Sequence, residues 1–305
     1  MEKRSLDLIS VSCDLCGSGR NKEIYSIPDI RLGDFEIEYP VVECLDCGHR
    51  FLSPRPSEED MPDFYPEEYF SGRDALRNQR GYRRRNDSLP RDSGRILDLG
   101  CAGGDWLASL PGEWKKTGVD FIGASSNAAD VDILVGELPE LDIEDEFFDV
   151  VTAWGVMEHV GSPLEYFKKV HRVLKPDGAF VFLVPNSESL WSRWAYKEDV
   201  PRHLHFFRKS TLERYADSCG FHVERVEATN RFYSIPATGR GLFKRNVLLG
   251  TRLSWERIAT NDYGGWRRVL GKFASALDVA LIHPALEETF GLAGSLFAIF
   301  SKREI

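Results

Sequence analysis

Long apolar runs are missing from this 305-residue sequence. A membrane-spanning helix needs about 18 consecutive apolar residues. The two longest runs, 273–282 and 291–300, are shorter, and a histidine, a proline and acidic or hydroxyl residues separate them. Residues 1–12 mix charges and contain no apolar segment of the kind found in secretory leaders. We therefore expect a cytoplasmic protein without a transmembrane segment.

Positive charge is in short supply as well. The chain has 39 Lys and Arg against 48 Asp and Glu, a net charge of −9. Because phosphate neutralisation dominates nucleic-acid affinity, this balance disfavours a surface built mainly for nucleic acid or for anionic lipid. The 42% hydrophobic and 29% charged residues are typical of a globular protein. The length suits one sizeable domain and a small accessory one.

Cysteine is sparse, with six residues, but four of them form two C-x₂-C pairs separated by 27 residues. In a reducing compartment this spacing predicts a tetrahedral Zn²⁺ site rather than disulfides. A glycine follows each pair and allows a turn that points backbone N–H groups at the thiolates. Since all four ligands come from the protein, the site would be structural. The predicted ligands are Cys13, Cys16, Cys44 and Cys47, with His49 as an alternative ligand or a neighbour.

Glycine is concentrated after one short apolar run. Residues 96–99 predict a buried strand that leads into a glycine-rich turn, 100–104, and then into a helical pattern over 105–110. Such a turn lets backbone N–H groups approach a ligand and aims a helix N-terminus at it. Taken alone, this is a weak signal of a binding site.

The segments that follow strengthen the signal. The strand predicted at 117–120 ends in Asp120, about 20 residues after Asp98. A doubly wound fold places a carboxylate that binds ribose hydroxyls at this position. The next predicted strand, 132–135, leads to a second acid, Glu137. The remaining expected elements are strands at 147–152, 179–184, 221–227 and 294–301, and helices at 163–174 and 211–219. This alternation predicts an α/β fold with a parallel sheet.

A resemblance to the class I S-adenosylmethionine (SAM)-dependent methyltransferases is carried by the ordered motifs ILDLGCAGG, GVD, GEL, FFDVVTAWGVMEHV, RVLKPDGAFVFLVPN and HLHFFRKSTLERYADSCGF. Within that family, the sequence is most similar to members with an N-terminal Cys-x-x-Cys zinc module. The resemblance spans about residues 13–226. It implies a Rossmann-like seven-stranded sheet with a small N-terminal zinc-ribbon-like module and an insertion before the last strand. In this family the last strand lies between strands five and six of the sheet.

Two departures from the family pattern stand out. Ala102 replaces the usual middle glycine of the turn, and the segment between Asp120 and Asp132 is shorter than usual. The family implies that the methionine end of SAM meets the turn, the ribose meets Asp120, and the adenine lies near Glu137, with Glu140 or Asp142 as alternatives. The predicted cofactor-binding residues are Asp98, Gly100, Cys101, Ala102, Gly104, Asp120, Phe121, Glu137, Leu138, Trp154, Tyr69 and Arg84.

The segment before the glycine turn has two interpretations. Residues 64–70, which include Tyr69, resemble the family's lead-in over the cofactor. Eight arginines against three aspartates between 73 and 95 favour a solvated helix. The alternative is that one arginine of 83–85 faces the SAM carboxylate or an anionic group of the substrate.

Three histidines are candidate general bases. Transfer to a hydroxyl needs a base whose pKa is near the working pH, and histidine fits best. His205 is the first candidate because its loop follows the fifth strand, with His203 second and His159 third. Each of them could instead be an ordinary loop or core histidine. Trp191, Trp194 and Phe206 are predicted to wall the acceptor pocket, although the tryptophans fit a core equally well.

We expect three segments: a zinc-binding module at 1–56, a helical lead-in at 57–94, and a SAM-binding domain at 95–305. Helical periods occur within 231–290, including 273–282, which predicts an insertion that forms a lid or a homodimer surface. The expected function is O-methylation of a sugar, glycan or secondary-metabolite hydroxyl. The alternatives are an RNA methyltransferase that grips nucleic acid with its zinc module, a sugar C-methyltransferase, and a silent SAM-binding scaffold.

Overall fold

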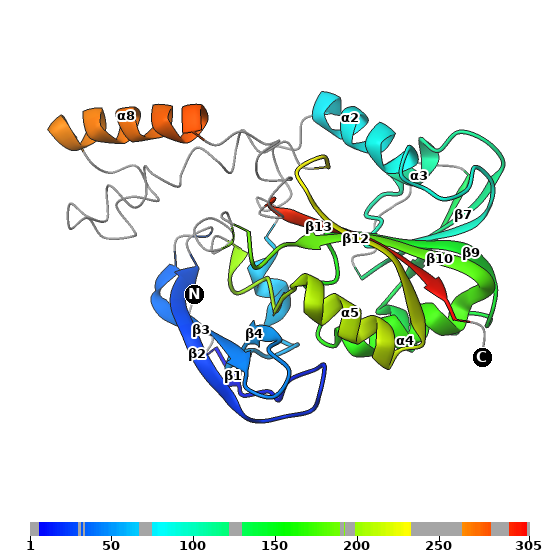
Figure 1. Cartoon of the computed structure of the whole chain (residues 1–305), viewed down its shortest axis with the longest axis horizontal. Helices are drawn as coiled ribbons and strands as arrows, with labels where there is room; N and C mark the ends of the chain where they lie inside the picture. Colours follow the sequence, from blue (N-terminus) through cyan, green and yellow to red (C-terminus); the bar gives the residue numbers. More distant parts are fainter. Residues whose placement is uncertain are drawn as a thin grey trace. The chain divides into compact units, whose positions relative to one another are not determined.

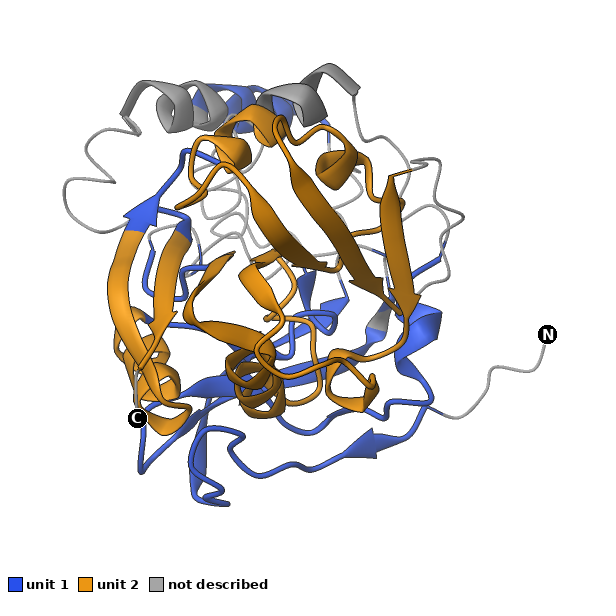
Figure 2. Ribbon diagram, turned by 90° about the vertical axis from the view of Figure 1, so that its right-hand side faces the viewer, with its two compact units in different colours: residues 1–71, 185–208, 228–295 blue, residues 72–184, 209–227, 296–305 orange. Residues whose placement is uncertain are grey.

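The computed structural model describes residues 6–29, 32, 34–66, 75–121, 130–189, 192, 199–232, 264–281 and 293–303. The chain divides into two compact units, coloured separately in Figure 2. The first unit combines Met1–Ser71, Pro185–Arg208 and Ala228–Ser295, and the second combines Gly72–Val184, Lys209–Glu227 and Leu296–Ile305. The three-segment division expected from the sequence stays a prediction. Among the helices within the described ranges, none has the length and hydropathy of a membrane span.

A seven-stranded sheet forms the centre of the second unit (Figure 1). Its order is β12-β13-β10-β9-β6-β7-β8, and β8, β7, β6, β9 and β10 pair in parallel. The last strand lies between the fifth and the sixth, as expected, so the Rossmann-like fold is confirmed. The strands are β6 (Gly94–Leu99), β7 (Trp114–Asp120), β8 (Val131–Val135), β9 (Phe148–Trp154), β10 (Leu174–Pro185), β12 (Phe221–Thr229) and β13 (Ser295–Lys302).

Helices of this unit start and pack as their sequences suggest. The helix α4 (Pro163–Val173) begins after Ser162, whose hydroxyl accepts the N–H of Glu165, and proline occupies its first position. Its buried Phe167 stacks on Tyr215 of α5 (Lys209–Ser218) at 5.1 Å between ring centroids and meets Phe182 of β10 edge-on. The other helices are α2 (Ala75–Asn86), α3 (Asp105–Ala108) and the 3₁₀ turn η2 (Leu138–Glu140).

The first unit contains a four-stranded sheet in the order β11-β4-β3-β2. Its strands are β2 (Asn21–Asp29), β3 (Asp34–Cys44), β4 (Arg50–Leu52) and β11 (His205–Phe206). A separate pair joins β1 (Leu8–Ile9) to β5 (Arg55–Pro56), and the unit also holds the 3₁₀ turn η1 (Met61–Phe64) and the helix α8 (Gly265–Leu281). The strand β11 differs from the loop expected there. It exists because β4, from the far N-terminal part of the sequence, supplies its hydrogen-bonding partner.

A buried ion pair reinforces this junction within the first unit. The two terminal nitrogens of the Arg202 guanidinium, Nη1 and Nη2, donate to the carboxylate of Asp29 at 2.8 and 2.9 Å. Both side chains are buried. The apolar core around the pair includes Tyr39 and Leu204. The segment before β11 is therefore bound to the β2–β3 hairpin by side chains as well as by backbone pairing.

Candidate functional site

The glycine-rich turn of the second unit joins β6 to α3, as predicted. Its backbone enters the left-handed region at Gly100 (φ 65°), Ala102 (φ 49°) and Gly104 (φ 79°). A β-carbon on Gly100 would lie 2.5 Å from Cγ2 of Val156, so this position excludes a side chain. A β-carbon on Gly103 would meet no atom within 4 Å. The turn thus leaves its backbone open at Gly103, near the carboxyl end of β6, where such folds hold a ligand.

Asp120, at the end of β7, is tied to this turn. Its Oδ2 accepts the backbone N–H of Ala102 at 2.8 Å, which sets the carboxylate beside the turn. Sequence reasoning missed Gly118 in the same strand, where a β-carbon would lie 2.4 Å from the Sγ of Cys101. Gly118 gives Cys101 the room to pack beneath the turn. The glycine of the GVD motif was the sequence feature that could have indicated this close packing.

Asp98 is buried at the end of β6. Its Oδ1 accepts the hydroxyl hydrogen of Thr152 at 2.6 Å. Burial raises the pKa of Asp98 to about 7, although the Thr152 hydrogen bond and the charge of Arg85 act in the opposite direction. The carboxyl group is therefore positioned beneath the turn as a hydrogen-bonding group that can hold a proton near neutral pH.

Arg85, next to the predicted Arg84 in α2, lies among aromatic side chains. Its guanidinium carbon is 5.1 Å from the ring centroid of Trp154 and 5.8 Å from that of Trp106. The indole N–H of Trp106 donates to Oδ1 of Asn86 at 2.8 Å, which fixes the aromatic wall. Residues 83–85 are three consecutive arginines, so the sequence alone could not indicate which of them meets the aromatic rings.

The remaining cofactor candidates lie in differing surroundings. Glu137 accepts a hydrogen bond from the Tyr166 hydroxyl, and burial together with this carboxylate raises the pKa of Tyr166. Leu138 is fully buried, whereas Phe121 is exposed. Tyr69 lies outside the described residues, as do Trp191 and Trp194.

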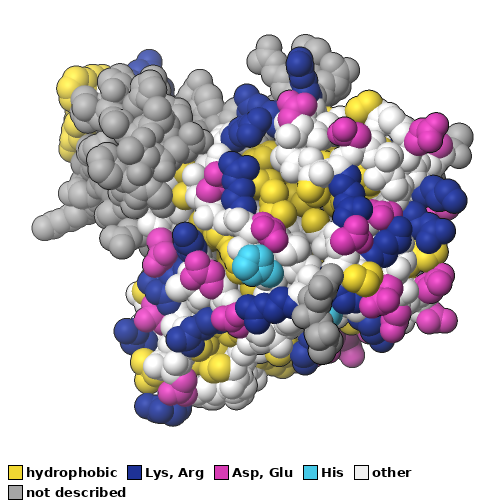
Figure 3. All heavy atoms as spheres, turned by 45° about the vertical axis from the view of Figure 1, so that its right-hand side comes forward, with side chains coloured by type: hydrophobic (Ala, Val, Ile, Leu, Met, Phe, Trp, Pro, Cys, Tyr) yellow, Lys and Arg dark blue, Asp and Glu magenta, His cyan; other side chains and the backbone are white. Residues whose placement is uncertain are grey.

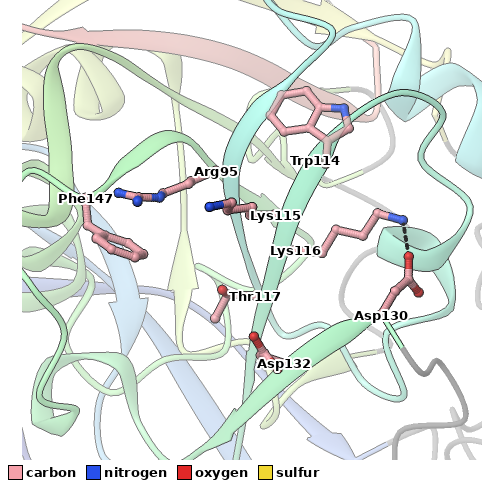
Figure 4. A pocket seen from close by; sticks show the side chains of 8 residues that line it. All are labelled: Arg95, Trp114, Lys115, Lys116, Thr117, Asp130, Asp132 and Phe147. Carbon is pink, nitrogen blue, oxygen red and sulfur yellow. Dashed lines mark hydrogen bonds and ion pairs between the residues drawn. The ribbon is translucent and has the colours of Figure 1, made fainter.

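A separate pocket of about 360 Å³ opens at the amino ends of the parallel strands (Figure 4). Within it, Arg95 lies over the ring of Phe147 at 4.1 Å from the centroid, and Lys116 reaches Asp130 at 2.7 Å. The other lining residues are Trp114, Lys115, Thr117 and Asp132. Because ligands of open α/β sheets bind outside the carboxyl ends of the strands, this pocket is not the candidate cofactor site.

The four predicted zinc ligands come together in the first unit. Their sulfur atoms all lie within 4.8 Å of one another, with 3.4 Å between Cys13 and Cys47 and 3.5 Å between Cys16 and Cys44. A tetrahedral Zn²⁺ site with bonds of about 2.3 Å sets its sulfurs about 3.8 Å apart. These separations exceed a disulfide bond, which is about 2.05 Å long. The donor set and its geometry therefore fit a zinc ion.

The two cysteine pairs have matching backbones. The N–H groups of Gly17 and Gly48 donate to the carbonyls of Cys13 and Cys44, and both glycines have φ near 70° (72° and 74°). Burial by itself raises the pKa of Cys44, but backbone N–H groups of Cys47 and Asp46 outweigh it and lower that pKa to about 7. The turn of the second pair thus favours the thiolate of Cys44, the form of cysteine that binds metals, whereas burial raises the pKa of Cys13 and of Cys47.

His205 and His49 form a buried pair in the first unit. Nδ1 of His205 lies 3.0 Å from Nε2 of His49, and the rings stack with centroids 5.3 Å apart. Burial lowers the pKa of His49 well below its usual range, and the neighbouring His205 adds to this. From the sequence, His49 could be identified only as an alternative ligand or a neighbour of the cysteines, since nothing local connects it to a residue in the second half of the chain.

The other two candidate bases have different partners. His203 is buried, with its Nε2 3.7 Å from the carboxylate of Asp199. His159 is half-buried and donates its backbone N–H to the carbonyl of Val156. The choice among the three histidines stays a prediction.

Charged side chains on the face drawn in Figure 3 are of mixed sign. Lysine and arginine alternate there with aspartate and glutamate, and the described residues on that face form no continuous basic patch. This arrangement agrees with the acidic net charge of −9.

Comparison with known proteins bears on the second unit most strongly. A family model described as a methyltransferase domain matches residues 72–226, about half of the chain. A probable SAM-dependent methyltransferase of Mycolicibacterium smegmatis is 28% identical over 180 residues, 56% of this chain and 66% of that protein. A demethylmenaquinone methyltransferase of Staphylococcus aureus is 32% identical over 108 residues, 32% of this chain and 45% of that protein.

A similar fold occurs in a solved structure. A chain of the complex between the Haloferax volcanii Trm112 methyltransferase activator and a methyltransferase superposes with a TM-score of 0.52 at 18% identity, covering 78% of this chain and 96% of that one. At this identity the likeness concerns the fold. The chain spans less than two thirds of the length of both curated relatives.

Proposed function

This chain belongs to the methyltransferase domain family, and from that premise we propose that it transfers a methyl group from SAM to a hydroxyl of a sugar, glycan or secondary metabolite. One observation carries the cofactor assignment: the open turn at 100–104 has the carboxylate of Asp120 bound to its backbone at Ala102. That pairing sets backbone N–H groups and a ribose-binding acid side by side.

SAM supplies an electrophilic methyl group when it is bound. The backbone of the turn would hold its methionine end, Asp120 its ribose hydroxyls, and Glu137 with Leu138 and Phe121 its adenine. The open space at Gly103 fits this assignment, because a ligand can approach the backbone there. Arg85 offers a cation for the SAM carboxylate from its aromatic surroundings, with Arg84 as the alternative.

His205 is the proposed general base. To accept a proton at Nε2, its ring must carry hydrogen on Nδ1, and that N–H would donate to Nε2 of His49 across the observed 3.0 Å. His49 would therefore select the reactive tautomer and orient the ring, as second partners of histidine do in many sites. His203 and His159 are the second and third candidates.

The four cysteines are proposed to bind one structural Zn²⁺. Their sulfur separations and the backbone N–H groups directed at Cys44 support this assignment. In that role the ion would stabilise the turn that carries His49, which lies two residues after Cys47. Because the four thiolates fill a tetrahedral site, the ion would leave no position open for a substrate.

Two other acceptors can be distinguished experimentally. The mixed charges of Figure 3 weigh against RNA, and retention of the protein on heparin at moderate salt would favour it instead. A quinone acceptor is the second candidate, since the Staphylococcus aureus relative is named for demethylmenaquinone. That relative matches only 32% of this chain, so the two proteins need not share an acceptor.

A transfer assay tests the proposal. Wild-type protein and SAM labelled in the methyl group are offered hydroxyl-bearing sugars, glycans and secondary metabolites, with quinones and RNA as competing classes. With the acceptor so identified, His205→Ala should lower kcat by about 10²- to 10⁴-fold and leave SAM affinity unchanged. His222→Ala, on an exposed part of β12, is the matched control. Full activity of the His205 variant would shift the role to His203 or His159.

A further inference from the structure

The helix α8 carries the three most exposed large apolar side chains among the described residues. Trp266, Val269 and Phe273 are 63%, 70% and 64% exposed. Their spacing of three and then four residues places them on one face of the helix. Single exposed apolar side chains are normal, but three aligned on one helix form a surface that water solvates poorly.

The same helix is locally basic in an acidic protein. Arg267, Arg268 and Lys272 lie among the apolar positions, whereas the single acid of the helix is Asp278, beyond them. The net charge of the whole chain is −9, so the charge of α8 is opposite in sign to that of the chain as a whole. The guanidinium carbon of Arg267 lies 5.2 Å from the ring centroid of Trp266, which joins a cation directly to the apolar face.

We propose that α8 binds the surface of an anionic lipid bilayer. The helix would lie in the plane of the membrane interface, with Trp266, Val269 and Phe273 entering the boundary between head groups and acyl chains. Arginine and lysine side chains would meet lipid phosphates, while tryptophan is a side chain that favours this boundary. At 17 residues with four charges, α8 is suited to lie on a bilayer rather than to span it.

Charge decides between a bilayer and the alternative occupant, a second copy of α8. Two such helices packed through their apolar faces would bring six basic side chains close together, whereas anionic head groups neutralise them. The acids elsewhere in the chain oppose this binding only within about 8 Å of the lipid at physiological ionic strength, because salt screens them beyond that distance.

Vesicle co-sedimentation of the full-length protein tests the proposal without depending on methyl transfer. Wild-type protein should sediment with vesicles of phosphatidylcholine mixed with phosphatidylglycerol, and much less with phosphatidylcholine alone. Trp266→Ser with Phe273→Ser should weaken binding by at least about tenfold. Arg268→Gln with Lys272→Gln should weaken it roughly thirtyfold, from about fivefold for each cation, and raised salt should mimic that loss.

Matched controls exchange exposed residues elsewhere: Ile24→Ser for the apolar change and Lys209→Gln for the charge. Both should bind as wild type does, and all variants should keep the wild-type melting temperature because the exchanged side chains are exposed. Absence of vesicle binding by folded wild-type protein would overturn the proposal, as would equal binding by the α8 variants. A dimer in light scattering that Phe273→Ser abolishes, without vesicle binding, would assign the face to a second copy instead.

Discussion

The cofactor turn and the cysteine–histidine region achieve rigidity by different means. At the turn, the backbone is shaped by glycines and by one carboxylate, and a side chain at Gly100 would collide with Val156. In the first unit, side chains hold distant segments together through four clustered thiols, a histidine pair and the ion pair of Arg202 with Asp29. The comparison shows that a site formed by the backbone depends on consecutive residues. A site formed by side chains depends instead on residues that are far apart in the sequence.

Metal removal should produce the largest effect and separate the two regions most clearly. Cys44→Ser, or a strong chelator, should unfold the cysteine module, since structural zinc supplies about 10–16 kcal/mol in small zinc-binding folds. Elemental analysis and hydrogen exchange of β3 and β4 would measure the loss. Cys219→Ser, at a buried cysteine of the second unit, is the control and should keep the metal. Wild-type protein without metal would contradict the account.

The buried ion pair is the next test. Arg202→Met leaves the buried Asp29 carboxylate without its two guanidinium hydrogen bonds and should lower the free energy of unfolding by about 3–5 kcal/mol. Denaturant titration would measure this change. The double variant Arg202→Met with Asp29→Leu should recover most of the loss, because no unpaired charge remains. If the single variant is as stable as wild type, side-chain pairing does not hold this segment.

These differences explain what the sequence could predict. The glycine turn, Asp120 and the parallel strands follow from consecutive residues, and the structure places the strands within a few residues of their predicted positions. The cysteine spacing likewise predicted the cluster. The strand β11 and the pair of His205 with His49 could not be predicted, because each depends on a partner more than 150 residues away that leaves no local periodicity.

Helix boundaries and neighbouring arginines show a second limit. The helix α8 begins at Gly265, whereas the apolar period indicated a start near residue 273. In α2, the contact of Arg85 with the ring of Trp154 could not be predicted from a run of three arginines. Packing, rather than composition, decides both features.

The buried carboxyl group of Asp98 in the cofactor region predicts that the stability of the protein depends on pH. Its pKa is about 7 in the folded protein and about 3.9 in an unfolded chain, so the folded state binds the proton more tightly. Stability should therefore fall as pH rises from about 4 through 7, by on the order of a few kcal/mol. Asp98→Asn should remove this slope and be more stable than wild type above pH 7. Asp132→Asn, at an exposed acid of β8, is the control for thermal unfolding across pH.

The smallest expected effect concerns the departure from the glycine pattern. Ala102 adopts φ 49°, a conformation that costs a side-chain-bearing residue roughly 1–2 kcal/mol. Ala102→Gly should raise the free energy of unfolding by about 1 kcal/mol or less, because the added flexibility of the unfolded chain offsets part of the gain. SAM affinity should stay near wild type. A destabilised variant would show that the methyl group of Ala102 makes a contact that outweighs its backbone strain.

Calorimetric titration with SAM tests the central claim most directly. Wild-type protein should bind SAM at one site per chain. Asp120→Ala should bind it about tenfold to a hundredfold more weakly, since a charge-assisted contact contributes on the order of 1.5–3 kcal/mol. Asp120→Asn, which keeps an oxygen acceptor for the N–H of Ala102, should lose less. Folded wild-type protein that does not bind SAM, or an Asp120→Ala variant with wild-type affinity, would contradict the assignment of the turn and its acid as the cofactor site.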